Sequence, residues 1–326
     1  MTLRIAITGG AGFIGTLLAR RLLAGPVALA GESPTEISEL ALLDLVTPPA
    51  DLRSDPRVRP LVGDLDDVLA DVGDPHAIFH LAGVVSGAAE KDFDLGMHTN
   101  VDGTRAVLER ARHGGQSPVV VFSSSLAVFG SDPAIGPIGV VDDDTLPRPQ
   151  SSYGVQKFIG EQLVADYTRK GFIRGRCVRL MTVSVRPGKP NAAASSFMSG
   201  MIREPLAGEA AACPVPPDTP IALSSPRCTL DGLMRAATVD DTTWGSRTAM
   251  NLPALTTTPA EMAEALDRVT GTRTSDLIDW SDDPAIAAIV RSWPARFHTP
   301  RASMLGLHAE QSFDHIIRAY IADNKK

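Results

Sequence analysis

Short apolar runs alternate with helical patterns in the first half of the chain, and this alternation limits the fold more than any other feature. The runs predict strands at residues 3–8, 40–46, 58–62, 77–83, 118–124 and 176–183. Helical spacing lies between them at 13–25, 99–115 and 153–171, and each stretch ends in glycine, a common residue at helix C-termini. Because the strand-like runs are continuously apolar, they suit strands covered on both faces. The pattern predicts an α/β fold with a Rossmann-type doubly wound parallel sheet.

The pattern changes after Arg186. Residues 187–228 are rich in Pro, Gly, Ala and Ser, and we expect loops and short elements over the ligand-binding edge of the sheet. We therefore predict a second, smaller C-terminal lobe that binds the substrate. The expected division is a Rossmann domain of residues 1–185 plus about 246–271, and a substrate-binding lobe of 186–245 and 272–326.

Regular elements return toward the C-terminus. The run at 249–254 predicts a strand that rejoins the sheet. A helix is expected at 258–271, where Thr258 and Glu261 have the spacing of a capping box. The last helix is expected at 310–324.

Composition excludes several classes of function. The net charge of -7 argues against general nucleic-acid binding, which needs a basic surface. No apolar run approaches the ~18 residues of a membrane span, and a strand pattern begins at once, so we expect no membrane segment, no signal peptide and a cytoplasmic location. The three cysteines lack CxxC spacing and the histidines are scattered, so we expect neither a disulfide framework nor a metal site.

A glycine-rich turn, ITGGAGFIG, joins the first predicted strand to the first predicted helix. Such a turn brings the backbone close to a pyrophosphate and points the helix N-terminus at it. The turn therefore predicts a dinucleotide site, and the alternative is a turn made only for packing. The predicted contacts are Gly9, Gly12, Phe13, Ile14 and Gly15.

Acidic and small residues at later strand ends extend this site. Asp44 ends the second strand, where its carboxylate can accept hydrogen bonds from the ribose hydroxyls and repel a 2′-phosphate, which favours NAD over NADP. Asp64 could meet the adenine amino group, or it could be a loop acid or helix N-cap. The small residues of HLAG leave room for the cofactor to cross the sheet edge. The further cofactor contacts expected from these two motifs are Leu65, Leu81, Ala82 and Gly83.

The motifs GGAGFIG, GDL, HLAG, TNVDGT, FSSSLAVFG and YxxxK follow one another in this order. Over roughly residues 3–185 the chain resembles the extended short-chain dehydrogenase/reductase family. The resemblance implies a Rossmann domain, NAD(P), a homodimer and a catalytic set that falls here on Ser125, Tyr153 and Lys157. It also implies that Lys157 holds the nicotinamide ribose. Asn100 in TNVDGT lies near the site or is a plain structural residue, and Phe129 stands where the family often has tyrosine.

The chemistry of these side chains agrees with a dehydrogenase. Removing hydride from an alcohol yields a carbonyl only if the hydroxyl proton also departs. The ordinary pKa of tyrosine, near 10, is too high for a good base at neutral pH. Lys157, on the same helix face as Tyr153, and the oxidised nicotinamide are expected to lower it by favouring the phenolate. Ser125 is expected to hold the substrate oxygen.

Two arginines suggest the substrate. Arg186 and Arg227 each offer the planar fork that suits a carboxylate, and the alternative for each is an ion pair between the lobes. Arg227 is the preferred anchor. Cations are sparse in 187–225, which disfavours a nucleotide-sugar.

The C-terminal stretches SSPRCTLDGLM, NLPALT and TPRASMLGLHAEQSFDHIIRAYI resemble a branch of the family that oxidises the C2 hydroxyl of a four-carbon sugar acid with NAD. We therefore expect a small hydroxy-acid substrate. The alternatives are a nucleotide-sugar epimerase or dehydratase, an L-threonine dehydrogenase-like enzyme, and, outside enzymes, a dinucleotide-sensing regulatory protein.

Overall fold

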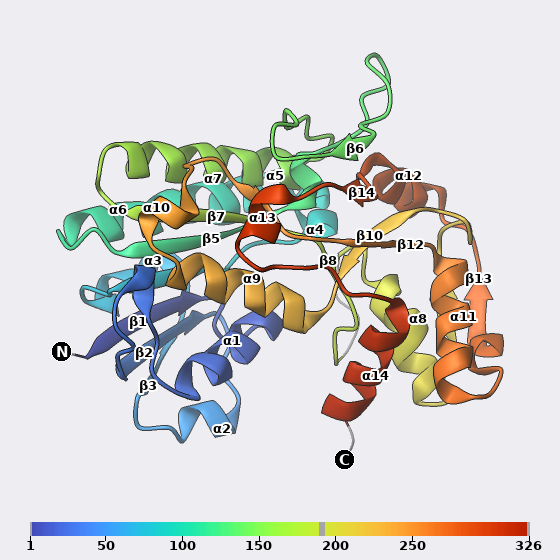
Figure 1. Cartoon of the computed structure of the whole chain (residues 1–326), viewed down its shortest axis with the longest axis horizontal. Helices are drawn as coiled ribbons and strands as arrows, with labels where there is room; N and C mark the ends of the chain where they lie inside the picture. Colours follow the sequence, from blue (N-terminus) through green and yellow to red (C-terminus); the bar gives the residue numbers. More distant parts are fainter. Residues whose placement is uncertain (1, 189–192, 325–326) are drawn as a thin grey trace.

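The computed structural model describes residues 2–188 and 193–324. Its centre is a parallel sheet in the order β11–β7–β5–β4–β1–β2–β3 (Figure 1). The strand order reverses between β1 and β4, the place where doubly wound sheets bind ligands at the carboxyl ends of the strands. The strands of this sheet are β1 (Leu3–Thr8), β2 (Ile37–Asp44), β3 (Val58–Val62), β4 (Ala77–His80), β5 (Val119–Ser125), β7 (Arg174–Leu180) and β11 (Met250–Asn251).

Helices cover both faces of the sheet. Ile5 and Ile7 of β1 belong to a core shared with α1 and α9, while Ala6 belongs to the core shared with α6 and α7. Because alternate residues of a strand point to opposite faces, burial on both sides requires the continuously apolar runs found in the sequence. The helices of this domain are α1 (Phe13–Leu23), α2 (Ala50–Arg53), α3 (Leu65–Val68), α4 (Ser86–Lys91), α5 (Phe93–Gly96), α6 (Gly103–His113), α7 (Ser152–Arg169), α9 (Pro226–Thr238) and α10 (Asp241–Trp244).

A smaller lobe with its own apolar core lies beside this domain, on the right in Figure 1. Its strands pair as β12–β10–β8 and β13–β9, and β14 pairs with β6. Its helices are α8 (Phe197–Leu206), α11 (Pro259–Thr270), α12 (Pro284–Ser292), α13 (Pro300–Met304) and α14 (Phe313–Asp323). The small strands are β6 (Val140–Val141), β8 (Thr182–Val183), β9 (Ala211–Cys213), β10 (Ile221–Ser224), β12 (Leu255–Thr257), β13 (Ile278–Trp280) and β14 (Arg296–Phe297). Among the described residues, no helix is long and apolar enough to cross a membrane.

The α/β fold with a smaller C-terminal lobe is confirmed, and so is the capping box. The Thr258 hydroxyl accepts from the Glu261 amide at 3.2 Å, and the Glu261 carboxylate accepts from the Thr258 amide at 3.0 Å. The expected irregular stretch 187–228 contains a full helix, α8. Its apolar residues Met198, Met201 and Ile202 are buried in the core of the lobe, which stabilises a helix despite its glycine and proline.

Two segments pack differently from the expected division of the chain. Helix α9, expected in the lobe, lies on the Rossmann sheet, where Leu233 and Ala236 join the core of β1. Helix α11, expected with the sheet, packs against α8 and α14, where Met262 and Leu266 meet Ile316. The amphipathic faces of these helices are similar, so periodicity alone does not tell which core each one covers.

Candidate functional site

The glycine turn follows β1 and leads directly into α1. A Cβ added at Gly15 would lie 2.1 Å from the Gly9 carbonyl oxygen, so the turn closes this tightly only without a side chain there. The Gly12 amide donates to the same carbonyl at 3.1 Å. The arrangement points the free amides at the start of α1 toward the carboxyl edge of the sheet, where they can meet an anion.

A cavity of about 650 Å³ runs along this edge of the sheet. Nearly all the predicted cofactor contacts line it, and Asn100 does not. The lining residues that the sequence predicted are Gly9, Gly12, Phe13, Ile14, Gly15, Asp44, Asp64, Leu65, Leu81, Ala82, Gly83, Ser125, Tyr153, Lys157 and Arg186. The cavity reaches from the end of β2 to Ser125 at the end of β5 and into the lobe, so it can hold a dinucleotide and a small second ligand.

Asp44 is fixed at the end of β2. Its Oδ2 accepts from the Ala11 amide at 3.0 Å, and its Oδ1 accepts from the Val46 amide at 3.2 Å. The carboxylate therefore lies against the glycine turn with lone pairs left for further donors. The Asp44 carboxylate can therefore accept hydrogen bonds from the two hydroxyls of a ribose, and its negative charge disfavours a 2′-phosphate.

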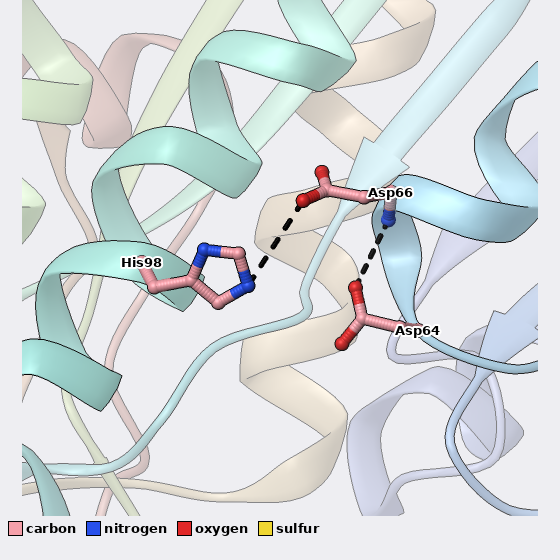
Figure 2. Close-up of side chains that lie close together, drawn as sticks. All are labelled: Asp64, Asp66 and His98. Carbon is pink, nitrogen blue, oxygen red and sulfur yellow. Dashed lines mark hydrogen bonds and ion pairs between the residues drawn. The ribbon is translucent and has the colours of Figure 1, made fainter.

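Three exposed side chains gather at the rim of the cavity beyond Asp44 (Figure 2). Asp64 is the N-cap of α3 and accepts from the Asp66 amide at 3.1 Å. The helix N-cap was one of the alternatives that the sequence left open for this residue. The His98 Nε2 lies 3.9 Å from Asp66 Oδ2. Because all three are exposed, their charges are solvated and the pair contributes little to stability. All three line the cavity, and the expected contact of Asp64 with an adenine stays a prediction.

A buried hydrogen-bonded group that the sequence reasoning missed lies under the cavity floor. His80 ends β4, and its Nδ1 is 2.7 Å from Thr8 Oγ1, which also accepts from the Ala82 amide at 3.1 Å. Burial, reinforced by the charge of Lys157, lowers the pKa of His80 to about 3, so the ring is neutral at neutral pH. In the sequence, the histidine of the HLAG motif was the signal that could have pointed to this group.

Asn100 holds the backbone that crosses above this floor. Its side chain accepts from the Val84 amide at 2.8 Å and donates to the Val84 carbonyl at 3.0 Å. It also donates to Gln156 on α7 at 2.8 Å. Asn100 is buried and does not line the cavity. It instead fixes the backbone of Val84, which does line the cavity.

The three predicted catalytic residues come together at one end of the cavity. Ser125 ends β5, and Tyr153 and Lys157 lie one turn apart at the start of α7. The helix approaches the strand end closely: a Cβ added at Gly154 would lie 2.1 Å from the Ala127 carbonyl oxygen. Ser151 caps the helix by accepting from the Gly154 amide at 3.2 Å. The first turn of α7 is therefore fixed against the serine-bearing strand.

Electrostatics at this end of the cavity are set by burial and by Arg186. Burial raises the pKa of Tyr153 to about 12, while a hydrogen bond with Ser125 and the charge of Arg186 act to lower it. Burial lowers the pKa of Lys157 to about 8. The Lys157 ammonium lies 4.9 Å from the centre of the Phe122 ring and 5.7 Å from that of Tyr153, so the aromatic faces stabilise its charge. The pKa of Tyr153 is therefore raised, and the expected lowering by Lys157 is not found: the groups that act against burial are Ser125 and then Arg186.

The two candidate arginines lie in different places. Arg186 lines the cavity, donates from Nε to the Val183 carbonyl at 3.0 Å and from Nη2 to Ser195 Oγ at 3.0 Å. Arg227 is exposed in the first turn of α9 and does not line the cavity. The structure therefore brings Arg186, and not Arg227, together with Ser125 and Tyr153.

Comparison with known proteins agrees with this geometry. Residues 5–221 match the model of the NAD dependent epimerase/dehydratase family. The chain is 51% identical to D-erythronate dehydrogenase of Cupriavidus necator, over 98% of each chain, and 40% identical to that of Haemophilus influenzae, over 98% of this chain and 99% of the relative. A solved nucleoside-diphosphate-sugar epimerase from Agrobacterium tumefaciens is 38% identical, with a TM-score of 0.86 over 99% of this chain and 94% of that one. This chain belongs to the NAD-dependent epimerase/dehydratase family, whose cofactor NAD fits the glycine turn and the carboxylate at the end of β2.

Proposed function

We propose that the protein oxidises the C2 hydroxyl of a small sugar acid, D-erythronate, to the 2-oxo acid with NAD. The observation that carries the proposal is the arrangement of Ser125, Tyr153 and Lys157 at one end of a dinucleotide-sized cavity, with a cationic Arg186 facing Tyr153. The 51% identity with a D-erythronate dehydrogenase over nearly the whole chain supports the choice of substrate.

Each side chain has a part in the reaction. Bound NAD would supply the acceptor for the hydride of C2. The Ser125 hydroxyl holds the substrate hydroxyl beside Tyr153, and the tyrosine oxygen accepts the proton that leaves as the C–O bond becomes a carbonyl. Lys157 would hold the ribose of the cofactor and keeps a positive charge near the Tyr153 ring. The proton thus leaves from the oxygen of the C2 hydroxyl, and the hydride leaves from C2 itself.

Arg186 is the proposed anchor for the substrate carboxylate. Its guanidinium is oriented by the Val183 carbonyl and Ser195, and burial lowers its pKa while the facing Tyr153 raises it. A carboxylate would compensate this half-buried cation and form charge-assisted hydrogen bonds with it. The sequence favoured Arg227, which is exposed at the start of α9, so we assign the role to Arg186.

Nucleotide-sugar epimerisation is the second candidate, because one similar solved structure carries that name. Such chemistry returns the hydride to the sugar, so the enzyme keeps its NAD and releases no net NADH. Among the described residues that line the cavity, Lys157 is the one lysine or arginine besides Arg186, so little positive charge there could meet a diphosphate, which favours the smaller acid.

The test is a substrate assay. Purified protein is mixed with NAD and D-erythronate, with L-threonine, or with a nucleotide-sugar, and NADH is followed by absorbance. We expect NADH only with the sugar acid, and Tyr153→Phe should abolish it. Epimerised nucleotide-sugar without NADH would overturn the proposal, and full activity of Tyr153→Phe would overturn the assignment of the base.

We also propose that the protein is a cytoplasmic homodimer. Phe93 on α5 and Val155 on α7 leave apolar side chains 60% and 43% exposed, and these two helices contact each other. Such a surface suits contact with a second copy. The thiols of Cys177 and Cys213 are free and buried, as expected for a reducing compartment. Light scattering on the purified chain tests the dimer, and a monomer would overturn it.

A further inference from the structure

Two cavities lie next to each other at the proposed substrate end of the site, and a wall of shared side chains separates them. The large cavity is lined there by Leu126, Thr182 and Trp293, and the same three residues line a second cavity of about 10 Å³. The second cavity continues into the lobe, where its lining is apolar apart from Thr182. The residues behind the wall are Met198, Pro220, Ile221, Ala222, Val290 and Pro294.

Trp293 is the part of this wall that comes from the lobe. It follows α12 directly and packs against Leu126, Met181 and Ala222. Leu126 and Met181 belong to the Rossmann side, next to the serine-bearing strand and at the end of β7. The indole therefore closes the cavity immediately beyond Ser125, where the far end of a small substrate would lie.

The backbone on both sides of Trp293 is held in place. Before it, the Ser292 carbonyl accepts from the Ser131 amide at 2.9 Å. After it, the Ala295 carbonyl accepts from Thr256 Oγ1 at 2.6 Å. β14 then pairs with β6. The backbone that carries the indole is therefore held on both sides by other segments of the chain, and the indole itself packs on the cluster of Leu126, Met181 and Ala222.

We propose that Trp293 sets the length of the sugar acid that the enzyme accepts. This inference rests on the proposed function, since it takes the carboxylate of the substrate to lie at Arg186 and its C2 hydroxyl at Ser125 and Tyr153. The chain beyond C2 then runs toward the indole. A four-carbon acid ends before the wall, whereas a fifth carbon meets it.

The small cavity cannot relieve that contact by itself. Its volume of about 10 Å³ is no more than one water occupies, and Thr182 is the one hydroxyl-bearing residue in a lining that is otherwise apolar. Removing the indole would join the two spaces. The space gained behind the indole is lined mainly by apolar side chains, so it would accept an apolar group of the substrate most readily. The most sensitive probe is therefore a substrate that adds a methyl group and no hydroxyl.

The experiment compares D-erythronate with its 5-deoxy five-carbon homologue in the full-length enzyme, with saturating NAD. The measured quantity is the ratio of kcat/KM for the two acids. We expect the wild type to prefer D-erythronate about tenfold or more, the discrimination that one carbon commands in an apolar pocket. Trp293→Ala should shift the ratio at least tenfold toward the homologue. Trp293→Leu, which keeps an apolar contact with Leu126, should shift it in the same direction by less and serves if the alanine variant does not fold.

Trp280→Ala is the matched control. Trp280 lies in the same lobe on β13, is 41% exposed and does not line either cavity, so its loss should leave the ratio unchanged. An unchanged ratio in folded Trp293→Ala and Trp293→Leu, with the wild type active on D-erythronate, overturns this inference alone. A wild type that oxidises neither acid overturns the proposed function and the inference together.

Discussion

Arg179 and Glu161 form a buried ion pair beside the end of β5, the strand that carries Ser125. The Arg179 Nη2 lies 2.7 Å from Glu161 Oε2, and its Nε donates to Oε1 at 2.8 Å. The Ser124 hydroxyl donates to the same carboxylate at 2.5 Å, and the guanidinium lies 4.7 Å from the centre of the Phe129 ring. The pair joins α7 to β7 and, through Ser124, to the serine-bearing strand. Phe129, where the family often has tyrosine, packs on this pair and is not part of the reaction.

Breaking this pair should destabilise the protein strongly. Arg179→Met leaves a buried carboxylate without its partner, and the expected loss is about 3–5 kcal/mol of the free energy of unfolding. Glu161→Gln should also destabilise, and the double variant should lose less than the sum of the two. Urea unfolding of the three variants measures these losses.

An exposed ion pair provides the control for that cycle. Arg20 and Asp51 lie 2.7 Å apart with side chains 45% and 56% exposed, so Arg20→Met should cost less than about 1 kcal/mol. If Arg179→Met costs no more than Arg20→Met, the buried pair does not anchor α7.

Lys157 should make stability depend on pH in the cofactor-free protein. Its pKa is lowered from 10.5 to about 8 by burial, so the unfolded chain binds more protons than the folded one between these two values. Stability therefore rises with pH across this window, and the full cost of the buried ammonium is present below pH 8. Lys157→Met should be more stable than the wild type at neutral pH by on the order of 1–3 kcal/mol, and the difference should shrink toward pH 10. A constant difference in urea unfolding at all these pH values would contradict the buried charge.

The cofactor end of the site could be predicted from the sequence because its signals are local. The glycine turn and Asp44 each follow a strand that the apolar pattern reveals, and parallel strands bring their ends to one edge. Asp64 was predicted as an adenine contact or an N-cap; it caps α3 and also lines the rim. His80 was passed over because nothing in the sequence shows which threonines surround it.

The substrate end depends on contacts between distant segments. Trp293 lies more than 160 residues from Leu126, and no motif links them. Arg227, in the stretch SSPRCTLDGL, was preferred as the anchor over Arg186, but it lies in the first turn of α9 with its side chain exposed. Side-chain direction at a helix start depends on how the helix packs, and that packing was not visible in the sequence.

Replacing Arg186 should affect both binding and the ionisation of Tyr153. Arg186→Met removes the proposed carboxylate anchor, and kcat/KM for D-erythronate should fall by about 100-fold, as expected when one partner of a hydrogen-bonded charge pair inside a binding site is lost. Because the charge of Arg186 lowers the pKa of Tyr153, the alkaline rise of kcat should also move to higher pH. Initial rates of NADH formation across a pH series measure both effects.

The exposed arginine is the control. Arg227→Met should change kcat/KM by less than about threefold, because losing a solvated surface charge costs little. A large loss of kcat/KM in Arg227→Met, together with a small loss in Arg186→Met, would show that Arg227 is the anchor.

Gly15→Ala should weaken NAD binding without unfolding the protein. The added Cβ would lie 2.1 Å from the Gly9 carbonyl oxygen, which is rigid backbone, so the turn must move away from the position that admits a pyrophosphate. We expect the Kd for NAD, measured by calorimetry, to rise at least tenfold. Gly25→Ala is the matched control, since it follows the same helix and its Cβ would meet no atom within 4 Å. Equal NAD affinity in the two folded variants would mean that the glycine turn serves packing alone, the alternative that the sequence left open.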